Sequence, residues 1–226
     1  MSRCAELRRI VHNVVVAPGL EWHRSSTPLV AYAEDARRVD ARIRSTGYDG
    51  VRIERRLLFS RSLGYLIVED RVRSGRPRPF DQLWHLPEDA APVIAAGDVT
   101  TARADGNLLV RSLLGGDART IAGSLDPIQG WVAWRYGERV AAPVIAIRKE
   151  GRQVRWITLL ATGAATPVVT TSDVEPSRDG YAVTVTIGYP GYSEFVRRGW
   201  MQDAMTTLAG FAQRMESAYD GNGNYG

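Results

Sequence analysis

The stretch YDGVRIERRLLFSRSLGYLIVEDRV, residues 48–72, decides the fold class of this chain. It contains two runs of β-branched and large apolar residues, Val51–Phe59 and Tyr65–Val72. Such runs are typical of β-strands. The first run follows Asp49-Gly50, a pair that suits a hairpin turn because glycine tolerates a positive φ. The stretch therefore predicts neighbouring antiparallel strands.

The same pattern continues on both sides of this stretch. Further strand-like runs are Val11–Val16, Asn107–Leu113, Val140–Ile147, Val154–Leu160 and Tyr181–Ile187. The pairs Asp105-Gly106, Glu150-Gly151 and Asp179-Gly180 separate runs and are predicted to form hairpin turns. No helical pattern alternates with the strands, so a parallel βαβ architecture is not expected. We predict an all-β fold, a large two-sheet antiparallel β-sandwich with one C-terminal helix.

The predicted helix covers about residues 200–219. Its apolar residues recur at helical spacing: Met201, Ala204, Met205, Leu208, Ala212, Met215 and Tyr219. The tail 220–226 is rich in Gly and Asn and is expected to be disordered. A chain of 226 residues is long enough to bury a substantial core, and all-β chains of this size commonly form one domain. We therefore predict a single domain over residues 1–226.

The charged residues are unusual in type rather than in number. The formal net charge is +4, and Lys149 is the single lysine among 29 basic residues, so arginine supplies the rest. Arginine pairs bidentately with carboxylate or sulfate, which fits an acidic polysaccharide as partner. A GC-rich genome produces the same bias. The arginines alternate with Asp and Glu and form no long basic stripe, so a nucleic-acid partner is not expected.

The termini and the cysteine count bear on where the protein acts. Cys4 is the single cysteine, which excludes an intrachain disulfide and the usual thiolate zinc motifs. The apolar run Val14–Ala17 is too short for a signal-peptide core. No stretch approaches the roughly 20 apolar residues that span a membrane. The sequence itself does not indicate the cellular compartment of the protein.

Three histidines and one tyrosine are the candidate functional residues. His12 and His85 lie in predicted strands, and with Asp40, in a strand-like segment between them, they could form a two-His, one-carboxylate zinc site. The alternative for each histidine is hydrogen bonding in the core. His23 lies in a polar stretch and is predicted to be solvated. Tyr48 lies in a glycine-flanked turn, which would present its phenol to a cleft, although packing is the alternative.

Common enzyme motifs are missing from the sequence. It contains no Gly-x-Ser-x-Gly, no phosphate-binding loop, no dinucleotide fingerprint and no His-Glu-x-x-His. This excludes the usual hydrolase, nucleotide-binding and metalloprotease signatures.

Three segments, taken in order, resemble the C-terminal domain of the heparinase II/III family. They are Val11–Val16, then Gly47–Gly50 with Arg55–Phe59, and Tyr65–Asp70 leading to Trp84-His85-Leu86. The resemblance covers most of residues 10–160. It implies a β-sandwich that packs with an N-terminal α/α toroid and cleaves acidic polysaccharide, such as a glycosaminoglycan or alginate, by β-elimination. For a bacterial lyase of this family it implies a periplasmic or cell-envelope location.

By the same resemblance, Tyr48 matches the tyrosine that protonates the departing oxygen, and His12, Asp40 and His85 match the ligands of a structural zinc. Glu54 departs from the family pattern, since many members have a histidine there. Only eleven residues precede His12, so we expect this chain alone to lack a complete active site unless a separately encoded toroid supplies it. A start site assigned too far downstream would give the same sequence.

Two other functions fit the sequence. One is a non-catalytic carbohydrate-binding or assembly module in which tryptophans such as Trp131 and Trp134 stack on sugar rings, although tryptophans in strands are usually core residues. The other is a purely structural partner domain, which would bind neither metal nor glycan.

Overall fold

The computed structural model describes residues 13–61, 64–104, 106–135, 137–177 and 180–188. These residues lie in one compact unit of the chain and form strands and connections, with no helix among them. The helix predicted over residues 200–219 and the predicted tail lie outside the described residues, as does His12. Within the described part, no helix is long and apolar enough to cross a membrane.

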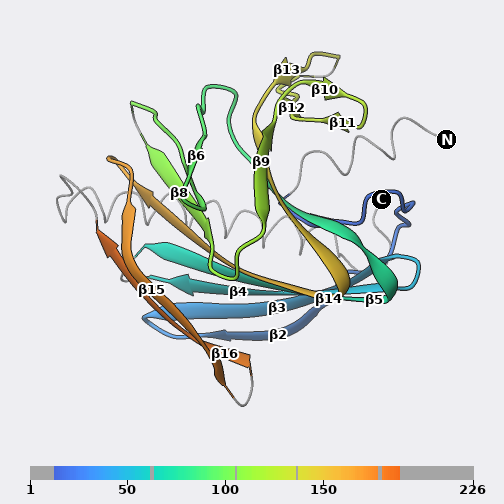
Figure 1. Cartoon of the computed structure of the whole chain (residues 1–226), viewed down its shortest axis with the longest axis horizontal. Coiled ribbons are helices and arrows are strands. Elements are labelled where there is room, and N and C mark those ends of the chain that lie inside the picture. The colour runs from blue at the N-terminus through green and yellow to red at the C-terminus, as the bar shows by residue number, and fades with distance from the viewer. Residues whose placement is uncertain (1–12, 62–63, 105, 136, 178–179, 189–226) are drawn as a thin grey trace. The chain divides into compact units, whose positions relative to one another are not determined.

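Sixteen strands make up the described fold (Figure 1). In chain order they are β1 (Val15–Val16), β2 (Leu29–Glu34), β3 (Arg38–Tyr48), β4 (Val51–Ser60), β5 (Tyr65–His85), β6 (Val93–Ala95), β7 (Asp98–Thr100), β8 (Asn107–Ser112), β9 (Asp117–Ile121), β10 (Ser124–Leu125), β11 (Ile128–Gln129), β12 (Trp131–Val132), β13 (Val140–Ala141), β14 (Val144–Gly163), β15 (Val168–Ser177) and β16 (Gly180–Gly188).

Ten of these strands belong to one antiparallel sheet. The strand order is β2-β3-β4-β5-β14-β8-β7-β6, and β1 and β9 pair with parts of β5 and β14. Three separate hairpins, β10–β11, β12–β13 and β15–β16, complete the fold. All of the pairings are antiparallel, which confirms the predicted all-β class.

The sheet has two layers because β5 and β14 each run through both. In one layer, residues 65–74 of β5 lie between β4 and the second half of β14, which also pairs with β8. In the other layer, the last residues of β5 pair with β1 and the first residues of β14 pair with β9. The two predicted sheets are therefore one sheet that bends along its central strands.

The bend corrects one prediction. Glu150-Gly151 is not a hairpin turn, because β14 continues through it and pairs with β5 on both sides. The register shifts between Gly151 and Gln153, which is a β-bulge, and Gly151 has a φ of 156°. On β5 the irregularity covers residues 74–77, where glycine and proline weaken regular pairing. By contrast, Asp49-Gly50 forms the predicted β3–β4 turn, with Gly50 at a φ of 69°.

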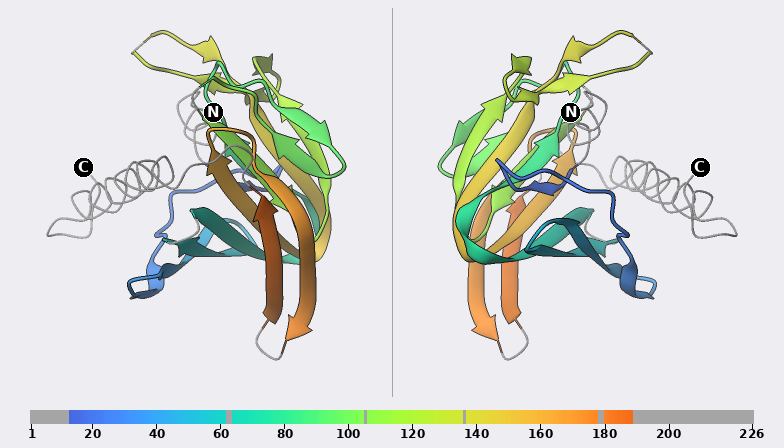
Figure 2. Two further views of the ribbon diagram at one scale, coloured as in Figure 1. Left: turned by 90° about the vertical axis from the view of Figure 1, so that its left-hand side faces the viewer. Right: turned by 90° about the vertical axis from the view of Figure 1, so that its right-hand side faces the viewer.

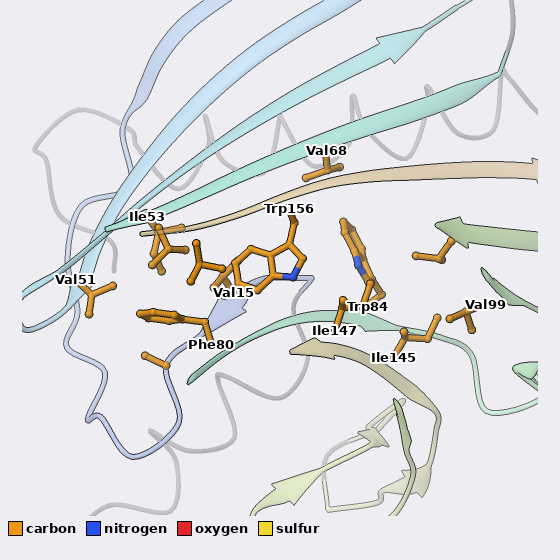
Figure 3. Packing of buried hydrophobic residues seen from close by; sticks show 14 of the residues in the cluster. Val15, Val51, Ile53, Val68, Phe80, Trp84, Val99, Ile145, Ile147 and Trp156 are labelled. Carbon is orange, nitrogen blue, oxygen red and sulfur yellow. The ribbon is translucent and has the colours of Figure 1, made fainter. Parts of the chain in front are cut away.

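The core fills the space between the two layers (Figure 3). Val68 and Trp156 come from one layer and Phe80, Trp84 and Ile147 from the other, and all are almost completely buried. Burying large aromatic side chains of this kind contributes much of the hydrophobic stabilisation of a small domain.

A second, smaller cluster lies on the outer side of the β5–β14 layer. There Val169, Val185 and Ile187 of the β15–β16 hairpin pack with Leu109 and Leu159. Figure 2 shows the two strands of this hairpin lying side by side.

Candidate functional site

Tyr48 lies at the end of β3, immediately before the Asp49-Gly50 turn, and is 5% exposed. It forms a β-bridge with Trp22. Its side chain lines a pocket of about 270 Å³ whose apolar wall includes Val14–Val16 and Trp22, and whose polar side chains include Ser45 and Arg55. The structure therefore places the tyrosine picked out by sequence in the wall of a pocket of mostly apolar character.

Gly47 makes the close approach of Trp22 possible. A Cβ at this position would overlap the indole, lying 2.8 Å from Trp22 Cδ1, so no other residue fits without moving that ring. The backbone N–H of His23 donates to the Gly47 carbonyl at 2.7 Å, which fixes the segment against the end of β3. The Gly47-Tyr48 pair is thus a packing requirement of the pocket.

Arg55 lines this pocket and forms a buried ion pair. Its Nε and Nη2 donate to the two carboxylate oxygens of Asp70, each at 2.7 Å, and the Asp70 side chain is 0% exposed. The guanidinium also lies 5.5 Å from the centre of the Trp84 ring. A charge that is bidentately paired and covered by an aromatic ring is held in one orientation.

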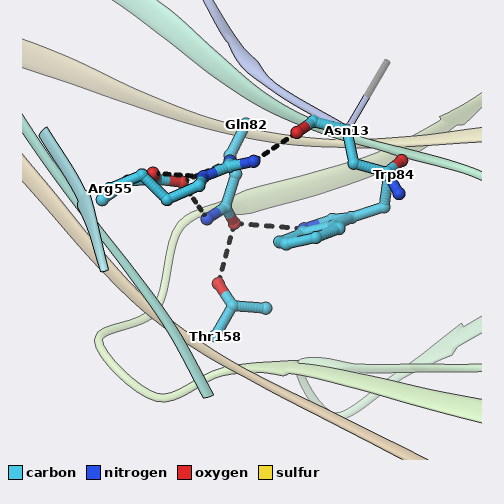
Figure 4. A network of polar contacts seen from close by, with 6 residues as sticks. Asn13, Arg55, Gln82, Trp84 and Thr158 are labelled. Atoms are coloured by element: carbon cyan, nitrogen blue, oxygen red, sulfur yellow. Dashed lines mark hydrogen bonds and ion pairs between the residues drawn. The ribbon is translucent and has the colours of Figure 1, made fainter. Parts of the chain in front are cut away.

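Gln82 extends this pair into a network across three strands (Figure 4). Its Nε2 donates to Asp70 Oδ2 at 2.7 Å. Its Oε1 accepts from Trp84 Nε1 at 3.1 Å and from Thr158 Oγ1 at 2.7 Å. Every polar group of the Gln82 side chain that meets the core thereby has a partner, as burial requires.

Asn13 ties the N-terminal segment to the end of β5. Its carbonyl oxygen accepts a hydrogen bond from Arg55 Nη1, and its Oδ1 accepts from the backbone N–H of His85 at 2.7 Å. Asn13 is covalently next to His12, which lies outside the described residues. His85 itself ends β5, opposite Val144, and both of its ring nitrogens are shielded from solvent.

Asp40 lies in a different environment. Arg56 donates to both of its carboxylate oxygens, with Nε–Oδ1 at 2.9 Å, and these hydrogen bonds lower the pKa of Asp40. Asp40 pairs with Leu58 of β4, which pairs in turn with Ile67 of β5. His85 is eighteen residues farther along β5, beyond the bend. Within the described residues no three His, Cys, Asp or Glu side chains gather as a metal site. His23, as predicted, is exposed, and it contacts Asp49.

The two tryptophans of the alternative function differ in exposure. Trp134 is 67% exposed, and its ring N–H donates to Glu88 at 3.0 Å. Trp131 is partly buried, donates to the Ser124 carbonyl and has Arg139 stacked 4.4 Å from its ring centre.

Sequence reasoning missed the Arg55–Asp70 pair, although a signal for it exists. Arg55 alternates with Ile53 and Leu57 on β4, and Asp70 alternates with Val68 and Val72 on β5. Each is a charged residue on the core-facing side of its strand. Two opposite charges in the apolar stripes of adjacent strands indicate a buried pair.

Comparison with known proteins identifies the fold. The family model described as heparinase II/III-like, C-terminal, matches residues 10–176. A search of curated proteins finds no match. Among solved structures, heparan sulfate lyase HepC from Pedobacter heparinus superposes with a TM-score of 0.66 at 17% identity, covering 78% of this chain and 29% of HepC.

Two further structures give the same result. A heparinase III gene product superposes with a TM-score of 0.65 at 14% identity. The match covers 82% of this chain and 31% of the heparinase III chain. Another heparinase III superposes with a TM-score of 0.64 at 16% identity, and the match covers 78% of this chain and 28% of that one. The chain thus spans less than a third of each of these structures. Because the family model covers more than half of its residues, the chain belongs to the heparinase II/III-like family, in the C-terminal domain.

Proposed function

We propose that this chain is the β-sandwich part of a polysaccharide lyase that cleaves a uronate-containing acidic polysaccharide by β-elimination. Family membership supports this reading. The observation that carries it is the position of Tyr48, which is held by Trp22 and the Gly47 backbone in the wall of a pocket. The heparan sulfate lyase named above has the same fold.

The reaction needs three groups. One neutralises the uronate carboxylate, a base removes the proton α to it, and an acid protonates the departing glycosidic oxygen. Tyr48 supplies the last proton in this proposal. Arg55 is paired with Asp70 and is therefore not assigned to the substrate carboxylate. The base and most substrate contacts would come from an α/α toroid.

The test uses the Tyr48→Phe variant with Tyr32→Phe as its control, since Tyr32 is exposed on the edge strand β2. The chain is mixed with a separately produced toroid domain of a relative and with heparan sulfate, and unsaturated uronate is followed by its ultraviolet absorbance. Tyr48→Phe should lower kcat by about 10²-fold or more, while Tyr32→Phe has no effect. Equal product formation by wild type and Tyr48→Phe would remove Tyr48 from the chemistry.

The second part of the proposal is a structural zinc bound by His12 and His85, and the family resemblance adds Asp40 as a third ligand. His85 fits it, since its ring nitrogens are shielded and Asn13, next to His12, bonds to its backbone. Asp40 does not fit in the described geometry, because Arg56 occupies both carboxylate oxygens. Elemental analysis of purified wild type should find about one zinc per chain, which His12→Ala and His85→Ala lose. Zinc retained in Asp40→Ala would exclude Asp40 as a ligand, and zinc absent from wild type would end the proposal.

A non-catalytic carbohydrate-binding module is the alternative function, and the exposed ring of Trp134 favours it. In that case Trp134→Ala should weaken binding of heparan sulfate by about tenfold or more, since one stacked ring contributes on the order of 1–2 kcal/mol. Tyr48→Phe should then leave binding unchanged and no unsaturated product should form with any toroid.

A further inference from the structure

One face of the sheet is rich in arginine, next to the part of that face on which the β15–β16 hairpin packs. In β3, β4, β5 and the second half of β14, alternate residues such as Ile53, Val72 and Trp156 point into the core. The residues between them point to the opposite side. We call this side the arginine face, and its arginines are Arg38, Arg42, Arg44, Arg52, Arg56, Arg71, Arg73 and Arg155.

The arginine face carries the charge excess of the whole chain. Its eight arginines are accompanied by three carboxylates, Asp40, Glu54 and Glu69, which leaves five positive charges. The formal net charge of the entire chain is +4. The remaining residues are therefore slightly negative on balance, and the positive excess is concentrated on four adjacent strands.

The arrangement of these charges is costly for the fold. Arg42 stands directly opposite Arg56, and Arg52 directly opposite Arg73, in neighbouring strands. Like charges in directly opposed positions destabilise a sheet. A face that merely contacted water would be more stable with one acidic residue in each pair. The repulsion is relieved when an anion lies between the two guanidinium groups.

The three carboxylates hold some of the arginines in place and leave others free. Glu54 accepts from Arg44 and Arg52, and Glu69 accepts from Arg71 and Arg155. Asp40 binds Arg56 as described above. Arg42 and Arg73 are exposed, and neither has a hydrogen bond or an ion pair with any of the described residues. Their donors are available to a ligand.

A groove of about 150 Å³ lies on this face, lined by Arg42, Arg44, Arg56 and Arg71. It is separate from the Tyr48 pocket. Ile43 and Arg55 line both cavities, and they alternate along their strands with the arginines of the groove. The two cavities thus lie on opposite sides of β3 and β4.

We propose that the arginine face is a second binding site for an acidic polysaccharide, outside the Tyr48 pocket. Neighbouring strands are about 4.8 Å apart, so arginines two strands apart, such as Arg44 and Arg71, present their charges about 10 Å from each other. That spacing suits anionic groups carried at intervals along a sugar chain. Guanidinium forks bind sulfate and carboxylate bidentately.

The carboxylates decide against a nucleic-acid ligand. Glu54 and Glu69 sit among the arginines and can accept hydrogen bonds from the hydroxyl groups of a polysaccharide, whereas the backbone of a DNA duplex offers no hydroxyl donors. The ligand class follows from the proposed function, but the site does not use Tyr48 or a toroid. Its role is to hold the polymer on the protein between cleavage events.

The test measures the affinity of the full chain for heparin by calorimetry over a series of salt concentrations. The variant Arg42→Glu/Arg73→Glu changes the two unpartnered arginines. Arg37→Glu/Arg135→Glu is the matched control, since both residues are exposed and the change in net charge is the same. Arg42→Gln/Arg73→Gln is a milder variant that also removes a repulsive charge. Melting curves check that each variant folds.

We expect Arg42→Glu/Arg73→Glu to weaken heparin binding at least tenfold relative to the control, and the milder variant to weaken it about threefold. The dependence of log Kd on log salt should become shallower by roughly one to two, as expected when two ion pairs to a polyanion are lost. Equal weakening in the control would overturn the site, as would a variant that binds like wild type.

Two further comparisons separate this inference from the proposed function. A chain that shows no lyase activity but loses heparin binding through Arg42 and Arg73 keeps the second site and rules out the proposed enzyme. A chain that is an active lyase but binds heparin equally well as Arg42→Glu/Arg73→Glu keeps the proposed enzyme and rules out the second site. A DNA duplex bound as tightly as heparin, through the same two arginines, would contradict the assignment to polysaccharide.

Discussion

Arg55 is a lining residue of the Tyr48 pocket whose orientation is fixed by its own hydrogen bonds. Its side chain is 11% exposed, and all three of its side-chain nitrogens donate hydrogen bonds, two to Asp70 and one to the Asn13 carbonyl. Buried ion pairs gain little net stability, but removing one partner leaves the other charge buried and uncompensated. The pair therefore acts on orientation more than on stability.

We predict that Arg55→Met lowers the free energy of unfolding by about 3–5 kcal/mol, because Asp70 loses its partner in the core. Arg52→Met, on the same strand but exposed, should cost no more than about 1 kcal/mol. The double variant Arg55→Met/Asp70→Leu should recover much of the loss. Urea denaturation of the purified variants measures all three free energies of unfolding. An equally small loss in Arg55→Met and Arg52→Met would contradict the prediction, because it would show that Asp70 is not left as an uncompensated buried charge.

Asp81 determines part of the response to acid. Burial by itself raises its pKa, but hydrogen bonds from Arg148 at 2.8 and 2.7 Å and from Arg119 at 3.0 Å outweigh it, so the pKa lies below its ordinary value. A carboxyl with a lowered folded-state pKa stabilises the fold above its unfolded-state pKa. That stabilisation is lost as the pH falls through the folded-state pKa.

We therefore predict that the unfolding free energy of wild type falls as the pH drops below about 4, the ordinary range of an aspartate, and that Asp81→Asn shows a shallower fall. Asp173→Asn is the control, since Asp173 is exposed in β15. Denaturation midpoints at a series of pH values give the comparison. Parallel curves for wild type and Asp81→Asn would contradict the assignment.

At the scale of single elements, the sequence predicts strands well and their limits poorly. Val51–Phe59 and Asn107–Leu113 match β4 and β8 to within one residue at each end, because each run ends at turn residues. Glu150-Gly151 has the same appearance, yet it is a bulge inside β14. A turn and a bulge both require a glycine with unusual φ, and only the pairing partner distinguishes them.

The candidate site also has a part that the sequence could locate and a part that it could not. Tyr48 and its turn could be located from the sequence because the Gly47–Gly50 segment is local. The set of His12, Asp40 and His85 depends on which strand ends meet, and β5 bends between the level of Asp40 and His85. The arginine face could not be predicted from the sequence either, because its residues come from four strands and no local pattern determines the register of those strands.

At the scale of the whole molecule, the two layers share their central strands. The pairing of β5 with β14 extends from Tyr65 with Ala161 to His85 with Val144 and crosses the bend. We predict that backbone amides of Ile147 and of Ile157, on either side of the bulge, exchange with solvent through openings of the same free energy. Native-state hydrogen exchange with increasing denaturant measures this, and a clear difference between the two would show that one layer opens alone.

The shared strands also bear on how such a domain can change over generations. Recombination between relatives succeeds where a segment can be exchanged without disrupting its contacts with the rest of the fold. Here an exchange of one layer would have to include half of β5 and half of β14, because both strands run through the two layers. The layer with the arginine face and the layer that anchors Asn13 are therefore inherited together. New binding properties should arise in this domain by point substitution on its faces and by insertions between β5 and β14.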